Sequence, residues 1–261
     1  MTAVLSESAQ SKGGIMQQQS FVKPALLFGV LSGMASATVL PYAMAINPQA
    51  ASAALPPFPV LLLVTFLQNT ILASLVAFFG LRAAAAVGLG SALHDAHIRA
   101  SLSRRTLVAM IGIGLFIGLL VWGLDQLFEP WMPELPALAD VSILARLGAV
   151  LYGGIAEEVL MRLGAMSIIA WLLTKLRIAP HYAVHVGIVA AAVLFGVGHL
   201  PAMGAIVPLT MIVMVSTVLL NAIPGIVFGT LYRRFGIEHS MLAHACADIM
   251  LVVLIPSMRG M

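Results

Sequence analysis

The chain has 261 residues, of which 61% are hydrophobic and only 9% are charged, whereas an ordinary soluble domain has about 25% charged residues. This composition excludes an ordinary soluble domain and predicts a polytopic membrane protein. The formal net charge of +3 does not indicate nucleic-acid binding, because the arginines lie in short segments between apolar runs and form no continuous basic face. The single cysteine, Cys246, excludes an intrachain disulfide and a CxxC metal site.

The first twenty residues are polar and contain Glu7 and Lys12, so they do not resemble a signal peptide. We predict a polar cytoplasmic tail over residues 1–20. Transmembrane helices without a recognised motif follow over residues 21–140, and a second membrane region covers residues 141–261.

Long apolar runs predict the membrane spans, since a transmembrane helix needs about 20 mostly apolar residues. The runs lie at residues 24–46, 59–80, 106–127, 143–174, 183–202, 206–232 and 239–256. The predicted fold class is therefore all-α, a polytopic transmembrane helix bundle with seven or eight spans. The number depends on the run 206–232, which contains Asn221 and Pro224-Gly225, where a helix is expected to kink or break.

The charges of two loops predict the orientation of this integral, multi-pass protein. The loop 81–105 contains four arginines, whereas the loop 125–140 contains four acidic residues and no lysine or arginine. Because cytoplasmic loops are enriched in lysine and arginine, the loop 81–105 and the amino terminus are predicted to be cytoplasmic.

The orientation raises a question about His199 and His244. With seven simple spans, His199 would lie near the outer end of its helix and His244 near the inner end of its own, so the two could not share a site. A helix break at residues 221–225 would bring them to one depth, although it would place Lys175 and Arg177 on the outer side, against the charge rule. We favour the break, because irregular backbone is tolerated at membrane depth where it lines a protein cavity.

Ionisable residues inside the predicted spans are the main indication of function. Such residues are costly in hydrocarbon and normally face a protein interior or a wet cavity. Glu158 and Arg162 are four residues apart and can form an ion pair on one helix face, while Glu157 points about 100° away. Glu157 could then accept a proton from water. The alternative is a buried Glu–Arg pair that only fastens helices together.

His199, His244 and Asp248 lie in two further predicted spans. His244 and Asp248 are again four residues apart, so both can reach one reacting atom or one metal ion. The alternatives are a helix-packing hydrogen bond for this pair and an ordinary interior histidine for His199. The sequence contains no GxSxG, HExxH or P-loop pattern, which removes the serine, zincin and nucleotide chemistries that these motifs indicate.

Three motifs occur in a recognisable order: EExxxR at 157–162, FxxxH at 195–199 and HxxxD at 244–248. This set resembles the CPBP family of intramembrane proteases, which includes the type II CAAX prenyl endopeptidases and the bacteriocin-processing and self-immunity (Abi) proteins. The segment 225–236 also looks like the family's approach to its last motif. The resemblance covers about residues 145–256, so residues 141–261 are expected to form a CPBP/Abi-like catalytic core.

The resemblance implies an intramembrane endopeptidase that hydrolyses a peptide bond near the membrane with a glutamate-activated water. It implies that Glu157 is the general base and that His199 orients the water. His244 and Asp248 would stabilise the developing oxyanion, with aspartate at 248 where the family has Asn or Asp.

The supporting residues implied by the family are Glu158 and Arg162. The family is also named a metalloprotease group, so a divalent metal such as Zn²⁺, held by Glu157, His199 and His244, is left open beside the metal-free form.

The expected partners are a peptide or protein substrate, prenylated or not, and the lipid bilayer, with no nucleic acid. Two other functions stay open. Intramembrane Glu, His and Asp residues also serve proton relays, which allows a proton-coupled or small-solute transporter. The second alternative is a non-catalytic immunity or scaffold protein of the same fold, since a fold does not prove catalytic activity.

Overall fold

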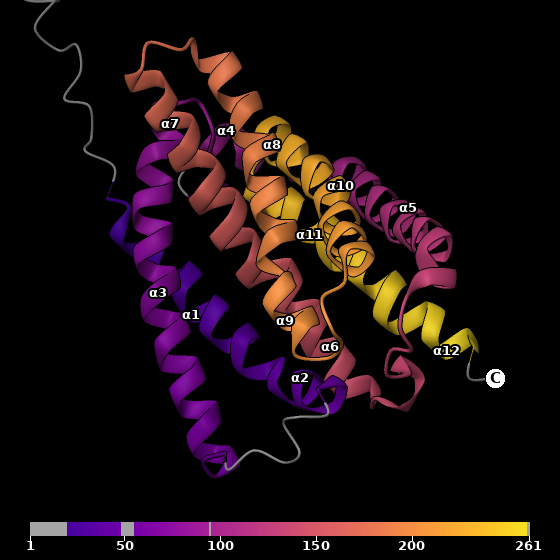
Figure 1. Cartoon of the computed structure of the whole chain (residues 1–261). Coiled ribbons are helices and arrows are strands. Elements are labelled where there is room, and N and C mark those ends of the chain that lie inside the picture. The colour runs from indigo at the N-terminus through magenta and orange to yellow at the C-terminus, as the bar shows by residue number, and fades with distance from the viewer. Residues whose placement is uncertain (1–19, 48–54, 94, 260–261) are drawn as a thin grey trace, which may run out of the picture.

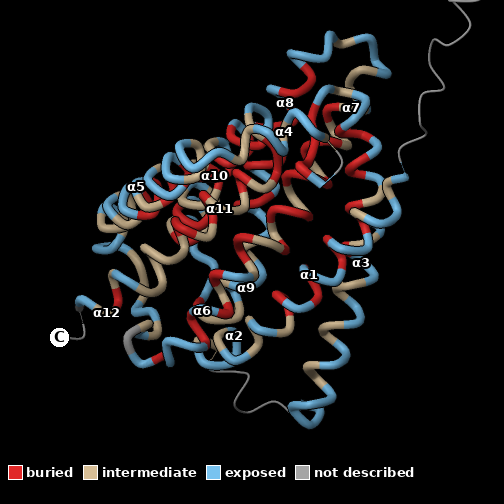
Figure 2. Tube along the Cα trace, turned by 180° about the vertical axis from the view of Figure 1, so that it is seen from behind, coloured by how far each residue is buried: buried red, intermediate tan, exposed pale blue. Residues whose placement is uncertain are grey.

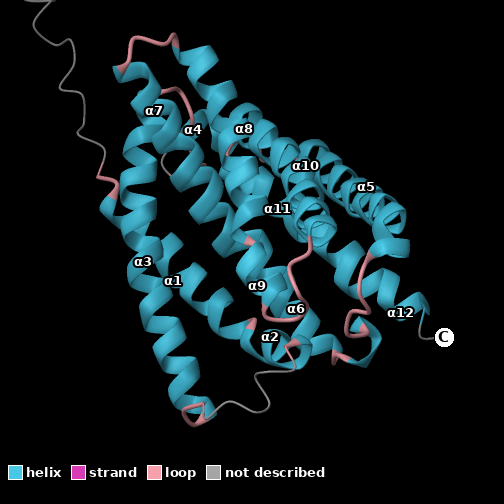
Figure 3. Cartoon of the chain, in the orientation of Figure 1, coloured by secondary structure: helices cyan, strands magenta, loops and turns pink. Residues whose placement is uncertain are grey.

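The computed structural model describes residues 20–47, 55–93 and 95–259. The predicted polar tail therefore lies outside the described residues, apart from Ser20. The described part of the chain is helical and contains no strand, which confirms the all-α fold class (Figure 3).

The amino-terminal half contains α1 (Val22–Thr38), α2 (Leu40–Ile46), α3 (Phe58–Ala86), the short α4 (Ala96–Ser101) and α5 (Arg104–Phe128). Two 3₁₀ turns, η1 (Glu129–Trp131) and η2 (Leu138–Asp140), lead to a continuous helical run made of α6 (Ile143–Leu151), the π-helical segments η3 (Tyr152–Glu157) and η4 (Val159–Met166), and α7 (Ser167–Lys175).

The carboxyl-terminal part contains α8 (Pro180–Gly198), α9 (Leu200–Gly204), α10 (Met211–Phe235) and α11 (Ile237–Asp248), followed by the π-helical η5 (Ile249–Leu254) and α12 (Ile255–Arg259) (Figure 1). Six helical stretches in the described residues are long and apolar enough to cross a membrane: Val22–Ile46, Phe58–Ala86, Arg104–Trp131, Pro180–Gly204, Met211–Phe235 and Ile237–Met258. The run from α6 to α7 is a further long helix, so seven long helical stretches are described, which agrees with the lower of the two predicted numbers of spans, seven or eight.

Buried side chains gather on the faces where the helices meet, and the outward faces are exposed and largely apolar (Figure 2). One buried cluster joins α3, η4, α8 and α10 around Leu81, Leu163 and Ile188. A second cluster joins α5, α10 and α11 around Phe228 and Ala243. Apolar faces that cannot be covered inside the protein are the surfaces a bilayer would cover.

The predicted break in the run 206–232 is wrong, because α10 continues as one helix through Pro224. A proline inside a helix removes one hydrogen bond and costs about 3 kcal/mol, but close packing against α8 holds α10 straight enough to continue. At Gly225 an added Cβ would lie 3.1 Å from Ala192, and at Gly229 it would lie 3.1 Å from Ile188. The chain instead reverses at Gly236, whose φ of 101° is unfavourable for residues with a side chain.

An unbroken α10 also removes the conflict with the loop charges. Nη1 of Arg233 lies 2.9 Å from Nε2 of His185, and the amide of Ile237 donates to the carbonyl of Gly90 at 3.3 Å. The end of α10, the start of α8 and the loop 81–105 therefore lie at one end of the bundle, in the upper part of Figure 1. The arginines of these segments share that end, as the charge rule requires. The cytoplasmic side of the bundle stays a prediction.

The packing of α5 on α11 yields a test of how tightly the second cluster is built. An added Cβ at Gly114 would overlap the main-chain carbonyl of Ala243, whereas one at Gly112 meets nothing within 4 Å. Gly114→Ala should lower the free energy of unfolding by about 1–3 kcal/mol, since the two helices must separate. Gly112→Ala, the control on the same helix, should be neutral or stabilising by up to ~1 kcal/mol. Unfolding in detergent measures both, and equal stability of the two variants would contradict the packing described.

Candidate active site

Glu157 lies at the end of η3, in the π-helical part of the run from α6 to α7. Such segments are rare and are frequent at functional sites. The same segment places Gly153 against α11, where an added Cβ would overlap Oδ2 of Asp248 and lie 3.3 Å from Nε2 of His244. A glycine is therefore needed here for η3 and α11 to approach closely enough to bring Glu157 and His244 together.

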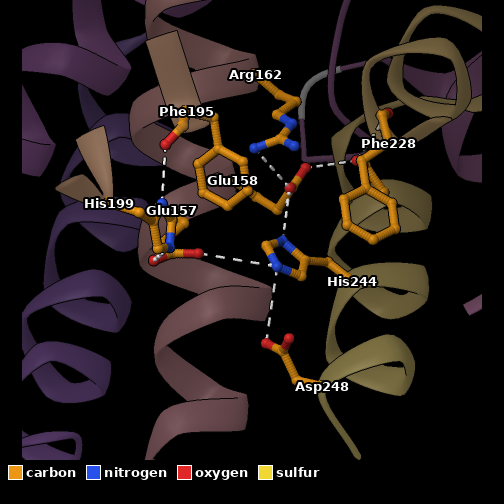
Figure 4. Close-up of polar contacts among 9 residues, drawn as sticks. Glu157, Glu158, Arg162, Phe195, His199, Phe228, His244 and Asp248 are labelled. Atoms are coloured by element: carbon orange, nitrogen blue, oxygen red, sulfur yellow. Dashed lines mark hydrogen bonds and ion pairs between the residues drawn. The ribbon is translucent and has the colours of Figure 1, made fainter. Parts of the chain in front are cut away.

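The carboxylate of Glu157 lies between two histidines, one facing each oxygen (Figure 4). Oε1 is 3.7 Å from Nε2 of His199, at the end of α8, and Oε2 is 3.8 Å from Nε2 of His244, on α11. Three helical segments far apart in the sequence thus direct their side chains to one point. This convergence does not need the predicted break in α10. The prediction that His199 and His244 lie at different depths failed because the position of a residue within a span does not show how that helix is shifted along its neighbours.

His199 is held by its own helix. Its Nδ1 lies 2.8 Å from the main-chain carbonyl oxygen of Phe195, and because a carbonyl oxygen only accepts, Nδ1 carries the hydrogen. In the neutral ring the lone pair is then on Nε2, the atom that faces Glu157. Phe195 packs edge-on against this ring, with centroids 4.6 Å apart.

His244 is held from three sides. Its Nδ1 lies 2.8 Å from Oε1 of Glu158, and its ring stacks on Phe228 with centroids 4.5 Å apart and planes at 22°. Its Nε2 faces both Oε2 of Glu157, at 3.8 Å, and Oδ2 of Asp248, at 3.7 Å. The spacing of four residues on α11 therefore brings His244 and Asp248 together, as predicted.

Glu158 is fully buried and has three partners. Its Oε1 is 3.2 Å from Nη1 of Arg162, which is the ion pair that the spacing predicted, and its Oε2 accepts a hydrogen bond from Oγ of Ser240 at 2.5 Å. His244 is the third partner. Arg162 is buried too, with its guanidinium carbon 4.6 Å from the ring centroid of Phe195, so the aromatic ring contributes to the stabilisation of the cation.

Sequence reasoning missed Ser240 and Phe228. Ser240 precedes His244 by four residues, so it shares a face with that histidine and could have been found by extending the motif one turn backward. No comparable signal marks Phe228, which lies on α10 and meets His244 only through tertiary packing.

The polar cluster has a dry half and an open half. The side chains of Glu158, Arg162 and His244 are 0%, 1% and 6% exposed, whereas those of Glu157, Asp248 and His199 are 15%, 21% and 32% exposed. Water can therefore reach Glu157 from the side of His199 and Asp248, while the Glu158–Arg162 pair stays shielded.

The structure does not support the metal set that the sequence left open. Among the residues that the structure describes, no group of three or more His, Cys, Asp or Glu side chains is arranged to hold a metal ion. Glu157, His199 and His244 approach one another through atoms 3.7 and 3.8 Å apart, which fits a water molecule that bridges acceptors and donors.

A cavity of about 110 Å³ adjoins the site on the side of α5 and α10. His244 and Asp248 form part of its wall, and the rest is mostly apolar. Its lining residues are Ile117, Val121, Phe195, Leu220, Asn221, Pro224, Phe228, His244, Ala247, Asp248 and Leu251.

The buried ion pair yields a stability test. Arg162→Met should lower the free energy of unfolding by about 3–5 kcal/mol, because it leaves Glu158 buried without its cation. The double variant Glu158→Gln/Arg162→Met should recover most of that loss, since the uncompensated charge is gone. Thermal unfolding in detergent measures both. A double variant that is no more stable than Arg162→Met would show that the ion pair is not what stabilises this region.

Comparison with known protein families gives a match in the carboxyl-terminal part of the chain. Residues 139–250 match the family model described as Type II CAAX prenyl endopeptidase Rce1-like, and this segment contains all six residues of the site. No curated protein and no solved structure matches the chain. Residues 139–250 are thus similar to the Rce1-like type II CAAX prenyl endopeptidases, which confirms the predicted resemblance to the CPBP family.

Proposed function

We propose that this protein is an intramembrane endopeptidase in which Glu157 activates a water molecule to hydrolyse a peptide bond of a membrane-bound substrate. The observation that supports the proposal is the position of the Glu157 carboxylate between two histidines, each of which has its other ring nitrogen fixed. At family level, the match to CAAX endopeptidases supports peptidase activity.

The attacking water would bind between Glu157 and His199. Oε1 of Glu157 and Nε2 of neutral His199 are both acceptors and lie 3.7 Å apart, so one water can donate a hydrogen bond of about 2.8 Å to each. Both hydrogens of the water are then used, and its lone pairs point away from the two side chains toward the substrate. Glu157 would take one proton as the new C–O bond forms.

His244 and Asp248 would bind the carbonyl oxygen of the scissile bond. The carboxyl groups of Glu158 and Glu157 face Nδ1 and Nε2 of His244, so the imidazolium form of the ring would keep its bond from Nδ1 to Glu158 and donate from Nε2 to the carbonyl oxygen. Asp248, when protonated, would supply a second hydrogen bond. Donors directed at a developing oxyanion are usually the largest single contribution to acyl transfer.

The proton that Glu157 takes from water would complete the reaction. As the C–N bond breaks, Glu157 would return this proton to the leaving nitrogen, which departs as an amine, and the new carboxylic acid carries the oxygen of the water. Glu158 and Arg162 would take no part in proton transfer. They would act as positioning residues that fix the ring of His244.

The substrate we propose is a membrane-anchored peptide, with a prenylated CAAX peptide as the first candidate because of the family match. The largely apolar cavity beside His244 and Asp248 is compatible with such a peptide. No observation on the described residues favours the transporter or the scaffold function over peptide hydrolysis.

The first prediction from the proposed mechanism concerns the general base. Glu157→Gln, which keeps the shape of the side chain but cannot accept the proton, should lower kcat for peptide cleavage about 10³-fold. Purified protein in detergent, incubated with a farnesylated CAAX peptide and its unprenylated twin, gives the rate by mass spectrometry of the products. Glu129→Gln, in an exposed segment, is the control and should keep wild-type activity. Undiminished cleavage by Glu157→Gln would exclude the proposed mechanism.

The second prediction separates two roles for Asp248. If Asp248 donates a hydrogen bond to the oxyanion, Asp248→Asn should retain activity, because the amide is also a donor, whereas Asp248→Leu should lose about 10²–10³-fold in kcat. If Asp248 acted as a base, both variants would lose activity equally. The two variants are compared with the same peptide assay.

A further inference from the structure

A single proline interrupts the hydrogen bonds of α10 beside the candidate active site. Pro224 has no N–H, so the main-chain carbonyl of Leu220, four residues earlier, lacks the donor that a helix normally supplies. Leu220 and Pro224 both line the cavity that contains His244 and Asp248. The carbonyl of Leu220 therefore belongs to a turn of α10 whose residues line this cavity. A carbonyl of this kind requires another hydrogen-bond partner.

Asn221 brings a second polar group to the same wall. Its Nδ2 donates to the main-chain carbonyl of Thr217 at 2.8 Å, which fixes the side chain against α10. This bond uses one of the two Nδ2 hydrogens and leaves Oδ1 as an acceptor. The turn from Leu220 to Pro224 thus brings a carbonyl acceptor and a carboxamide to a cavity that is otherwise mostly apolar and that His244 and Asp248 also line.

We infer that the carbonyl of Leu220 and the side chain of Asn221 bind the main chain of the substrate next to the scissile bond. The carbonyl of Leu220 accepts a hydrogen bond from a substrate N–H, and Asn221 pairs with the neighbouring peptide group. This inference rests on the proposed endopeptidase function and assigns two positioning groups to it. Pro224 matters because its missing N–H leaves the Leu220 carbonyl available to the substrate.

The size of the cavity favours a peptide segment as its occupant. Its volume of about 110 Å³ is smaller than the ~150 Å³ apolar cavity that holds a benzene molecule. A main-chain segment with a small side chain fits this space. The carbonyl of Leu220 and the side chain of Asn221 also match the alternating donors and acceptors of a peptide main chain.

Pro224→Ala provides the sharpest test, because alanine restores the N–H that occupies the Leu220 carbonyl. The variant should unfold at the same temperature as wild type or higher, since the helix gains a hydrogen bond. Its kcat/KM for peptide cleavage should nevertheless fall about tenfold, the effect of losing one hydrogen bond to the substrate. Asn221→Leu should also lose about tenfold. Asn69→Leu is the matched control, because Nδ2 of Asn69 makes the same bond to Thr65, at 2.9 Å, on the distant α3.

Substrates that lack one main-chain N–H test the proposed hydrogen bond from the substrate to the carbonyl of Leu220. In a set of peptides, each amide near the scissile bond, other than the scissile one, is replaced in turn by an ester. Wild type should lose about tenfold in kcat/KM at one position, and Pro224→Ala should lose less than about twofold at that position, because the two changes remove the same interaction. A purely structural role for Pro224 would not produce this dependence.

Two results would overturn the inference while leaving the proposed function intact: wild-type kcat/KM in Pro224→Ala, or an ester penalty that is equal in Pro224→Ala and wild type at every position. Failure of the wild-type protein to cleave any peptide, prenylated or not, would instead overturn the proposed function and this inference with it.

Discussion

The buried carboxylate of Glu158 is the constraint on which the rest of the site depends. An ionised group without water is strongly destabilising unless its partners satisfy it. Glu158 obtains these partners from its own helix, through Arg162, and from α11, through Ser240 and His244. The charge can therefore stay buried only when the run from α6 to α7 packs on α11 in one relative position. The same contacts fix the ring of His244, so a requirement of stability also orients a group of the candidate active site.

The adjacent Glu157 has a different environment because successive residues of a helix point in different directions. One glutamate turns into the protein, and the other turns toward His199 and the more exposed side of the cluster. A pair of identical side chains thereby acquires two environments, which the sequence could indicate from spacing alone. Glu158 and Arg162 are four residues apart and lie on one face, and their partnership follows from helix geometry.

Contacts between helices could not be predicted from the spacing of residues within one helix. Spacing within a helix predicted the Glu158–Arg162 pair and the proximity of His244 to Asp248, and apolar run length predicted the helices. Neither the spacing of residues nor the length of apolar runs shows how one helix is shifted along its neighbour. The depth argument for His199 and His244 therefore led to a break at Pro224 that does not occur. Whether α10 breaks at Pro224 depends on its packing against α8, through contacts such as Gly225 against Ala192. No local sequence pattern predicts these contacts.

Close helix packing explains how a polar cluster can form at membrane depth at all. At Gly153 and Gly114 the backbones of neighbouring helices approach so closely that a Cβ would overlap the facing chain, as is typical of helix interfaces in membranes. This proximity lets a short side chain such as that of Ser240 reach partners on other helices. It also limits water to the side where His199 and Asp248 are partly exposed. The Glu158–Arg162 pair therefore lies shielded from water, directly beside the partly exposed Glu157 and His199, where a water molecule can enter. Hydrolysis inside a membrane would require such an arrangement.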